Sequence, residues 1–86
     1  MPAQARRSVY EHTVHITHGY LGPAAERFVD RQVRNHLHKA PEHITEKDLS
    51  LLIRWIRLAV SLLTDDSRIV EEYIGQLEQL ARESQS

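Results

Sequence analysis

The chain has 86 residues, no cysteine and a formal net charge of −1 from 11 basic and 12 acidic side chains. This length allows one domain, the lack of cysteine excludes disulfides and thiol catalysis, and the balanced charge disfavours a general nucleic-acid binder. No apolar run approaches the roughly 20 residues of a bilayer span, and no apolar stretch follows the basic N-terminus as in a secretory signal. We therefore expect a soluble cytoplasmic protein without a cofactor.

The first segment with helical periodicity spans residues 8–21. It places four side chains on one helical face: Val9, Thr13, Ile16 and Tyr20. Residues 13–17 also alternate and are rich in β-branched side chains, which suits a strand. No second strand is predicted that could satisfy its backbone, so we favour a helix.

The second segment, residues 23–39, follows a break at Gly22 and starts with a proline, which the first helical position tolerates well. Its apolar residues form one narrow stripe. We expect the helix to end before Pro41, because the residue before a proline is pushed out of the α region.

The third and fourth segments, residues 46–63 and 67–82, are joined by a short turn and should form an antiparallel hairpin. Thr45 can cap the third helix, and Asp66 or a neighbour can cap the fourth. The fourth helix carries its apolar residues on one side: Val70, Tyr73, Ile74, Leu77, Leu80 and Ala81.

Together these segments predict one all-α domain over residues 8–82. The fold is a small four-helix bundle, or three long helices with one short one. A polar, flexible arm at residues 1–7 and a frayed end at residues 83–86 flank this domain.

The third helix differs from the others because it is apolar on two faces. One face is a complete core set: Leu49, Leu52, Ile53, Ile56, Ala59, Val60 and Leu63. The second face consists of Leu51, Trp55, Leu58 and Leu62. A helix that is apolar nearly all round must be buried nearly all round.

Two arrangements can bury that second face. Either the other three helices wrap around the third one, or a partner covers the face centred on Trp55. Monomers avoid exposed apolar patches, and tryptophan is a frequent interface anchor. We predict a non-catalytic protein–protein interaction module, either a homodimer or a module docked on a larger protein.

A basic stripe on the second helix supports an alternative function. Arg27, Arg31 and Arg34 share one face, and such a stripe could bind phosphates in a nucleic acid or an acidic partner. The alternative interpretation is a solvated face whose charges pair with nearby acids such as Asp30 and Glu71.

Little in the sequence indicates catalysis or metal binding. His12, His15 and His18 recur at every third position, so they spiral around the helix, whereas zinc needs three or four converging ligands. No HExxH, GxSxG or phosphate-binding glycine loop is present. We therefore predict no metal site and no enzyme. The alternative is a metal held by two of these three histidines together with His36 or His38 of the second segment.

The segment from Tyr20 to Val29, YLGPAAERFV, resembles a motif of a small uncharacterised helical domain found attached to bacterial serine/threonine kinases and other signalling proteins. The resemblance covers about ten residues directly and about sixty by helix order. This chain differs in standing alone and in its unusually apolar third helix. The resemblance implies a regulatory or assembly role in a bacterial signalling system and supplies no catalytic residues.

Overall fold

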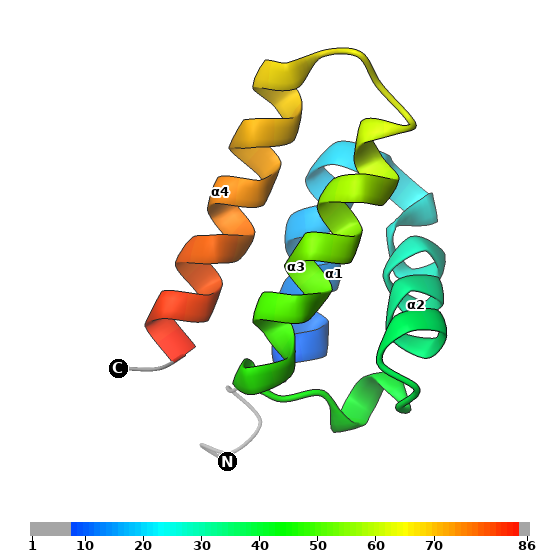
Figure 1. Cartoon of the computed structure of the whole chain (residues 1–86), viewed down its shortest axis with the longest axis vertical. Coiled ribbons are helices and arrows are strands. Elements are labelled where there is room, and N and C mark those ends of the chain that lie inside the picture. Colours follow the sequence, from blue (N-terminus) through cyan, green and yellow to red (C-terminus); the bar gives the residue numbers. More distant parts are fainter. Residues whose placement is uncertain (1–7, 85–86) are drawn as a thin grey trace.

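The structure, a computed structural model, describes residues 8–84, and every regular element in this range is helical. The elements are α1 (Val9–Leu21), η2 (Gly22–Ala24), α2 (Ala25–His36), η3 (Pro41–His43), α3 (Glu46–Ser61) and α4 (Ser67–Ser84), where η denotes a single 3₁₀ turn (Figure 1). The prediction of an all-α fold is confirmed, and the first segment is a helix, not a strand. The predicted arm at residues 1–7 lies outside the described residues, as do residues 85 and 86 of the predicted frayed end.

Side-chain capping explains where α1 begins, and a glycine explains where it ends. The Ser8 hydroxyl accepts a hydrogen bond from the Glu11 backbone N–H at 3.1 Å, and the Glu11 carboxylate accepts one from the Ser8 N–H at 3.0 Å. This capping box satisfies N–H groups that have no partner inside the helix. Gly22 follows α1 with φ of 61°, a conformation that favours glycine.

The second helix is shorter than predicted at both ends. Pro23 belongs to the 3₁₀ turn η2, and α2 begins at Ala25. It ends at His36, and His38 adopts a left-handed backbone with φ of 54°. That conformation stops a helix. Pro41 therefore does not terminate α2, as the sequence suggested, but starts the turn η3.

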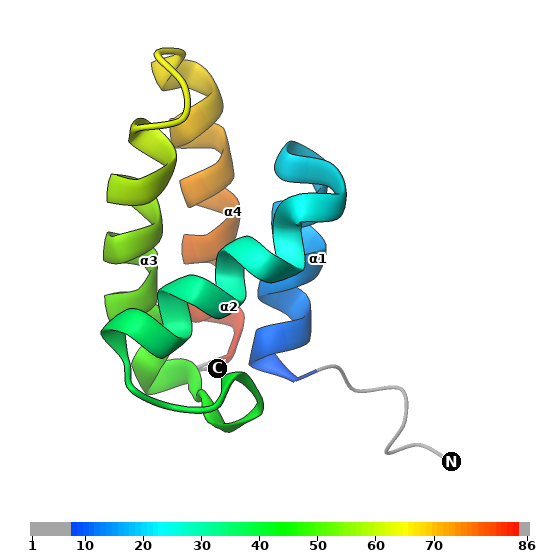
Figure 2. The same cartoon turned by 90° about the vertical axis from the view of Figure 1, so that its right-hand side faces the viewer.

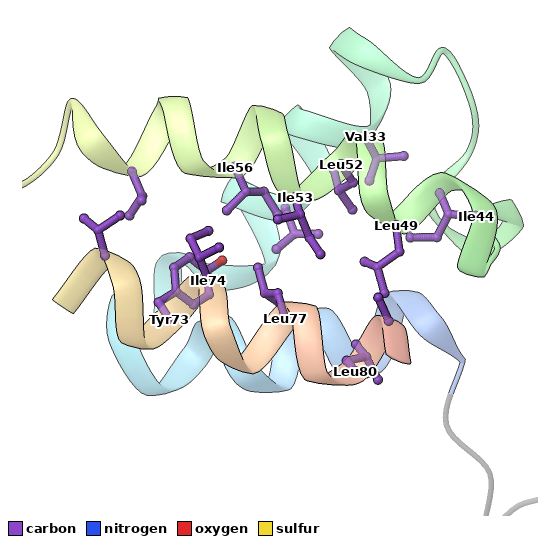
Figure 3. Close-up of a cluster of buried hydrophobic side chains, with 14 residues drawn as sticks. Val33, Ile44, Leu49, Leu52, Ile53, Ile56, Tyr73, Ile74, Leu77 and Leu80 are labelled. Carbon is purple, nitrogen blue, oxygen red and sulfur yellow. The ribbon is translucent and has the colours of Figure 1, made fainter. Parts of the chain in front are cut away.

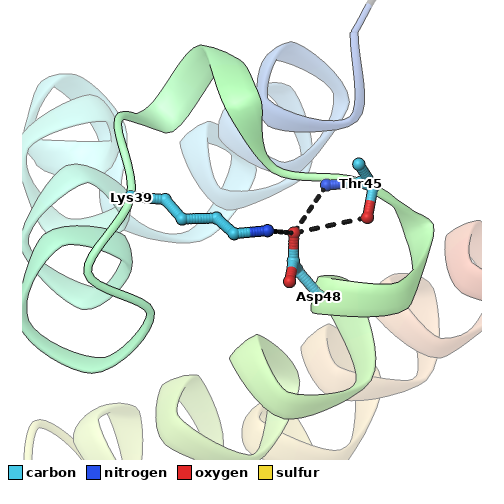
Figure 4. Close-up of polar contacts among 3 residues, drawn as sticks. All are labelled: Lys39, Thr45 and Asp48. Atoms are coloured by element: carbon cyan, nitrogen blue, oxygen red, sulfur yellow. Dashed lines mark hydrogen bonds and ion pairs between the residues drawn. The ribbon is translucent and has the colours of Figure 1, made fainter.

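The start of α3 is tied to the preceding loop by one carboxylate (Figure 4). Asp48 Oδ2 accepts hydrogen bonds from the Thr45 backbone N–H at 3.0 Å and from Lys39 Nζ at 2.7 Å. The hydrogen bond from Lys39, followed by that from Thr45, outweighs burial and lowers the pKa of Asp48. The predicted start near Thr45 is confirmed, and the Lys39 contact also fixes the α2–α3 connection.

A short turn joins α3 to α4, and the two helices run antiparallel (Figure 1). Asp66 Oδ1 caps α4 by accepting from the Arg68 backbone N–H at 3.0 Å. All six apolar residues predicted on one side of α4 are buried. They meet the buried side of α3, including Leu49, Leu52 and Ile56, in a single core (Figure 3).

On the other side of α4, α1 contributes two buried threonines. Thr17 Oγ1 lies 2.6 Å from the Tyr73 hydroxyl, and it also donates to the Thr13 carbonyl at 2.7 Å. Because the single hydroxyl proton of Thr17 is committed to that carbonyl, Tyr73 is the donor in their contact. Burial raises the pKa of Tyr73 to about 12. A polar contact therefore fixes α1 against α4 inside a largely apolar interior.

Candidate interaction surface

The second apolar face of α3 is largely uncovered. Leu51, Trp55, Leu58 and Leu62 lie within about 60° of one another around the helix axis when the α-helical repeat is extended to Leu62. Leu51 is 43%, Leu58 60% and Leu62 87% exposed. In Figure 2, α3 stands at the left edge of the molecule, away from α1. We call these four residues the α3 strip.

Trp55, the predicted centre of this face, is partly covered by α2. Its ring stacks on the His36 ring, with centroids 3.9 Å apart and planes inclined by 2°. Trp55 is therefore half-buried, and the leucines supply most of the exposed apolar surface. The sequence could not show this contact, because it depends on how α2 crosses α3.

The apolar surface extends past the C-terminal end of α3. Leu63, predicted as a core residue, is 61% exposed, so that prediction is wrong. The physical reason is that α3 ends at Ser61 and the chain turns before Leu63 can reach the core. Ile69, in the first turn of α4, is 43% exposed. The sequence Thr64-Asp65-Asp66 favours a turn and indicated that the helical repeat of α3 would not continue through this region.

The structure brings part of the basic stripe of α2 next to the α3 strip. A groove of about 330 Å³ lies between the first half of α2 and the end of α3. Phe28, Leu62 and Leu63 are among its apolar lining residues, and Arg27 and Arg31 also line it. Both arginines are exposed, and neither makes an ion pair with a described residue. This groove thus combines apolar contacts with positive charge.

Arg34 and Arg57, two further arginines near these surfaces, are paired, and one of the pairs differs from the expected one. Arg34 Nε lies 3.8 Å from Asp30 on the same helix. Glu71, expected to face the α2 arginines, instead accepts from Arg57 at 2.6 Å and 3.3 Å. This contact lowers the pKa of Glu71 and raises that of Arg57. The α2 stripe therefore receives no neutralisation from Glu71.

The three candidate metal-binding histidines of α1 are not brought together with further ligands. His12 is half-buried, whereas His15 and His18 are exposed. Over residues 8–84, no group of three or more histidine, aspartate or glutamate side chains is placed so that it could hold a metal ion. Every buried side-chain nitrogen or oxygen in this range has a hydrogen-bond partner.

Comparisons with known proteins identify no relative. No protein-family model, curated protein or solved structure matches the chain. The helices between residues 8 and 84 all lack the length and apolar character needed to cross a lipid bilayer. A function must therefore be inferred from the surface itself, which offers exposed leucines bordered by arginines.

Proposed function

We propose that this chain is a non-catalytic protein–protein interaction module that forms a homodimer through the α3 strip. The single observation that carries this proposal is the exposure of Leu51, Leu58 and Leu62 on one side of α3. Three leucines in one strip form a contiguous apolar patch of the kind that marks an interaction site.

The energetics favour covering this strip. Full burial of a leucine side chain contributes roughly 1.5–3 kcal/mol, and the exposed fraction of each leucine sets how much of that contribution a partner can add. Trp55 supplies a ring that α2 already holds rigidly against His36, so little side-chain ordering remains to oppose association. Because His36 covers part of Trp55, the leucines and not the tryptophan dominate the gain.

We further propose a regulatory or assembly role in a cytoplasmic bacterial signalling system, with helices α1 to α4 acting as one small bundle. The support is the resemblance of the segment from Tyr20 to Val29 to a helical domain attached to bacterial kinases. In the fold, this segment forms the end of α1, the turn η2 and the start of α2. The resemblance therefore concerns the helical scaffold of the domain. The proposed partner surface lies outside this segment, on α3.

Light scattering on the wild type, Leu58→Glu and Gln79→Glu tests the dimer. Both positions are exposed and helical, and both variants add one carboxylate, but only Leu58 lies in the α3 strip. We expect dimers for the wild type and Gln79→Glu and monomers for Leu58→Glu, with all three equally helical by circular dichroism. A wild type that stays monomeric, or a Leu58→Glu variant that stays dimeric, would refute the proposal.

A second candidate function is nucleic-acid binding through α2. The observation that favours it is that Arg27 and Arg31 are exposed and lack ion-pair partners among the described residues. Binding of a duplex or single-stranded probe should then weaken with salt, and the slope should fall by about one when either arginine is replaced. Absence of binding at low salt would exclude this function.

A further inference from the structure

We propose that the two copies pair through α3 in an antiparallel arrangement, with the twofold axis passing the helix midway between Ile56 and Arg57. This inference rests on the proposed function, since it requires a homodimer formed by the α3 strip. It goes further by fixing the direction of the partner helix, its register and the charged contacts at its ends.

The apolar residues of the strip are symmetric about that midpoint. Leu51 and Leu62 lie at equal distances from it along the chain, and so do Trp55 and Leu58. A twofold axis there places Leu51 opposite the partner's Leu62 and Trp55 opposite the partner's Leu58. In such an interface each contact occurs twice, as a C2 dimer requires. Every residue of the α3 strip then meets another residue of the strip.

The ends of the strip carry opposite charges. Lys47 lies on the same side of α3 as Leu51, four residues before it and one helical turn away. Asp65 and Asp66 lie in the turn beyond the C-terminal end of α3 (Figure 1). The antiparallel register brings Lys47 to the acidic turn of the partner, which carries the partner's Asp65 and the partner's Asp66.

These charged groups are accessible for such contacts. Lys47, Asp65 and Asp66 are exposed, and no hydrogen bond or ion pair joins Lys47 or the Asp65 carboxylate to another described residue. Asp66 uses Oδ1 to cap α4, which leaves Oδ2 able to accept from a lysine. Antiparallel packing also sets the positive N-terminal end of each α3 beside the negative C-terminal end of the other.

A parallel arrangement of the same two helices lacks this complementarity. It would place Lys47 against the partner's Lys47 and the acidic turn against the partner's acidic turn. Like charges in direct contact oppose association. The charge pattern of the strip therefore selects the antiparallel dimer over the parallel one.

Disulfide trapping tests the register, because the chain has no cysteine of its own. The variants L51C and L62C each place one thiol in the exposed strip. Eleven residues separate the two positions, about 16 Å along a helix, whereas a disulfide needs Cα atoms about 4.4–6.8 Å apart. We expect a disulfide-linked dimer when the two variants are mixed and oxidised, and little or none from either variant alone.

The other outcomes separate this inference from the proposed function. Cross-linking of each variant with itself, with no mixed disulfide between L51C and L62C, would show a parallel dimer and overturn only the inference. No cross-link in any sample, with a dimeric wild type by light scattering, would place the interface or register elsewhere and also overturn it. A monomeric wild type would overturn both.

Charge reversal supplies an independent measurement that leaves the apolar contacts intact. Lys47→Glu and Asp65→Lys should each raise the dimer dissociation constant about tenfold, since each creates two like-charge contacts per dimer. The double variant should recover part of the lost affinity, because it restores one pair of opposite charges while Asp66 stays unchanged. Single variants that dimerise like the wild type would contradict the antiparallel register. Circular dichroism checks that each variant is folded.

Discussion

The two apolar faces of α3 use similar side chains for different purposes. Leu49 and Leu52 are fully buried against the rest of the core, whereas Leu51 and Leu58, only a few positions away, are 43% and 60% exposed. The first face holds the monomer together because burial removes its apolar area from water. The second face adds little to the monomer and stays available to another chain.

The two faces carry the same residue type, so the role of each leucine depends on whether neighbouring helices cover it. Helices α4 and α2 pack against the buried side of α3, and the stacking of His36 on Trp55 extends the cover from α2 towards the other side. The leucines of the α3 strip stay exposed among the described residues, and we propose that a second copy covers them.

The largest difference should appear in a matched pair of leucine truncations. Leu52→Ala removes buried atoms and should lower the free energy of unfolding by about 2–5 kcal/mol. Leu58→Ala should change that of the monomer by no more than about 0.5 kcal/mol, because its side chain is mostly in water. Urea unfolding, at protein concentrations low enough to keep both variants monomeric, measures the difference. Equal losses of unfolding free energy in the two variants would contradict the proposed difference between the two faces.

The burial of the Tyr73 hydroxyl should make stability fall at high pH. The pKa of Tyr73 is raised to about 12 in the folded state, against about 10 unfolded. Its contribution is therefore complete below pH 10 and is lost as the pH rises towards 12. Roughly 2–3 kcal/mol should disappear in this window, at about 1.4 kcal/mol for each pH unit.

Tyr73→Phe isolates that effect. The variant loses the hydrogen bond to Thr17, so near neutral pH it should be less stable by about 1 kcal/mol. It has no hydroxyl to ionise, so its stability should decline less above pH 10 than that of the wild type. Parallel pH curves for the two proteins, followed by urea unfolding, would contradict the role given to Tyr73.

The cap at the start of α3 should give a smaller effect with the opposite pH dependence. Asp48→Ala removes the acceptor for Thr45 and Lys39 and should lower the free energy of unfolding by about 1 kcal/mol. Because the pKa of Asp48 is lowered in the folded state, its contribution is present above the unfolded value of about 3.9. That contribution is lost as the pH falls through the lower folded value. Thermal melts of both proteins should therefore converge in acid; a constant difference would argue against this cap.

An effect of similar size should come from the boundary between the two faces. His36→Ala removes the ring that stacks on Trp55 and should lower the free energy of unfolding by about 0.5–1.5 kcal/mol. Trp55 is the single tryptophan of the chain, so fluorescence reports on this site alone. Its emission should shift to longer wavelength as water reaches the indole. An unchanged spectrum would mean that His36 does not shelter Trp55 in solution.

Periodicity predicted the buried residues well where a helix keeps a regular repeat along its whole length. In α4, the apolar spacing from Val70 to Ala81 identified six residues that are all buried. In α3, five of the seven predicted core residues are buried, Ala59 is half-buried and Leu63 is exposed. Leu63 was missed because periodicity assumes that the helix continues, and α3 ends at Ser61.

Contacts between helices were harder to predict because they depend on crossing geometry. The stacking of His36 on Trp55 and the pairing of Arg57 with Glu71 join residues from different helices, and no spacing in the sequence encodes either contact. The end of α2 was also missed, since His38 adopts a left-handed conformation that a non-glycine residue seldom takes. The α3 strip itself was predictable, because its four residues recur on one face of one helix.

Sedimentation equilibrium of the unmodified chain over a wide range of concentrations tests the central claim most directly. If a second copy covers the α3 strip, the mass should rise from 10.0 kDa to twice that value as the concentration increases, and no larger species should form, because a twofold interface closes on itself. A mass that stays at 10.0 kDa up to about millimolar concentration, where even a dissociation constant of 1 mM would show association, would contradict it.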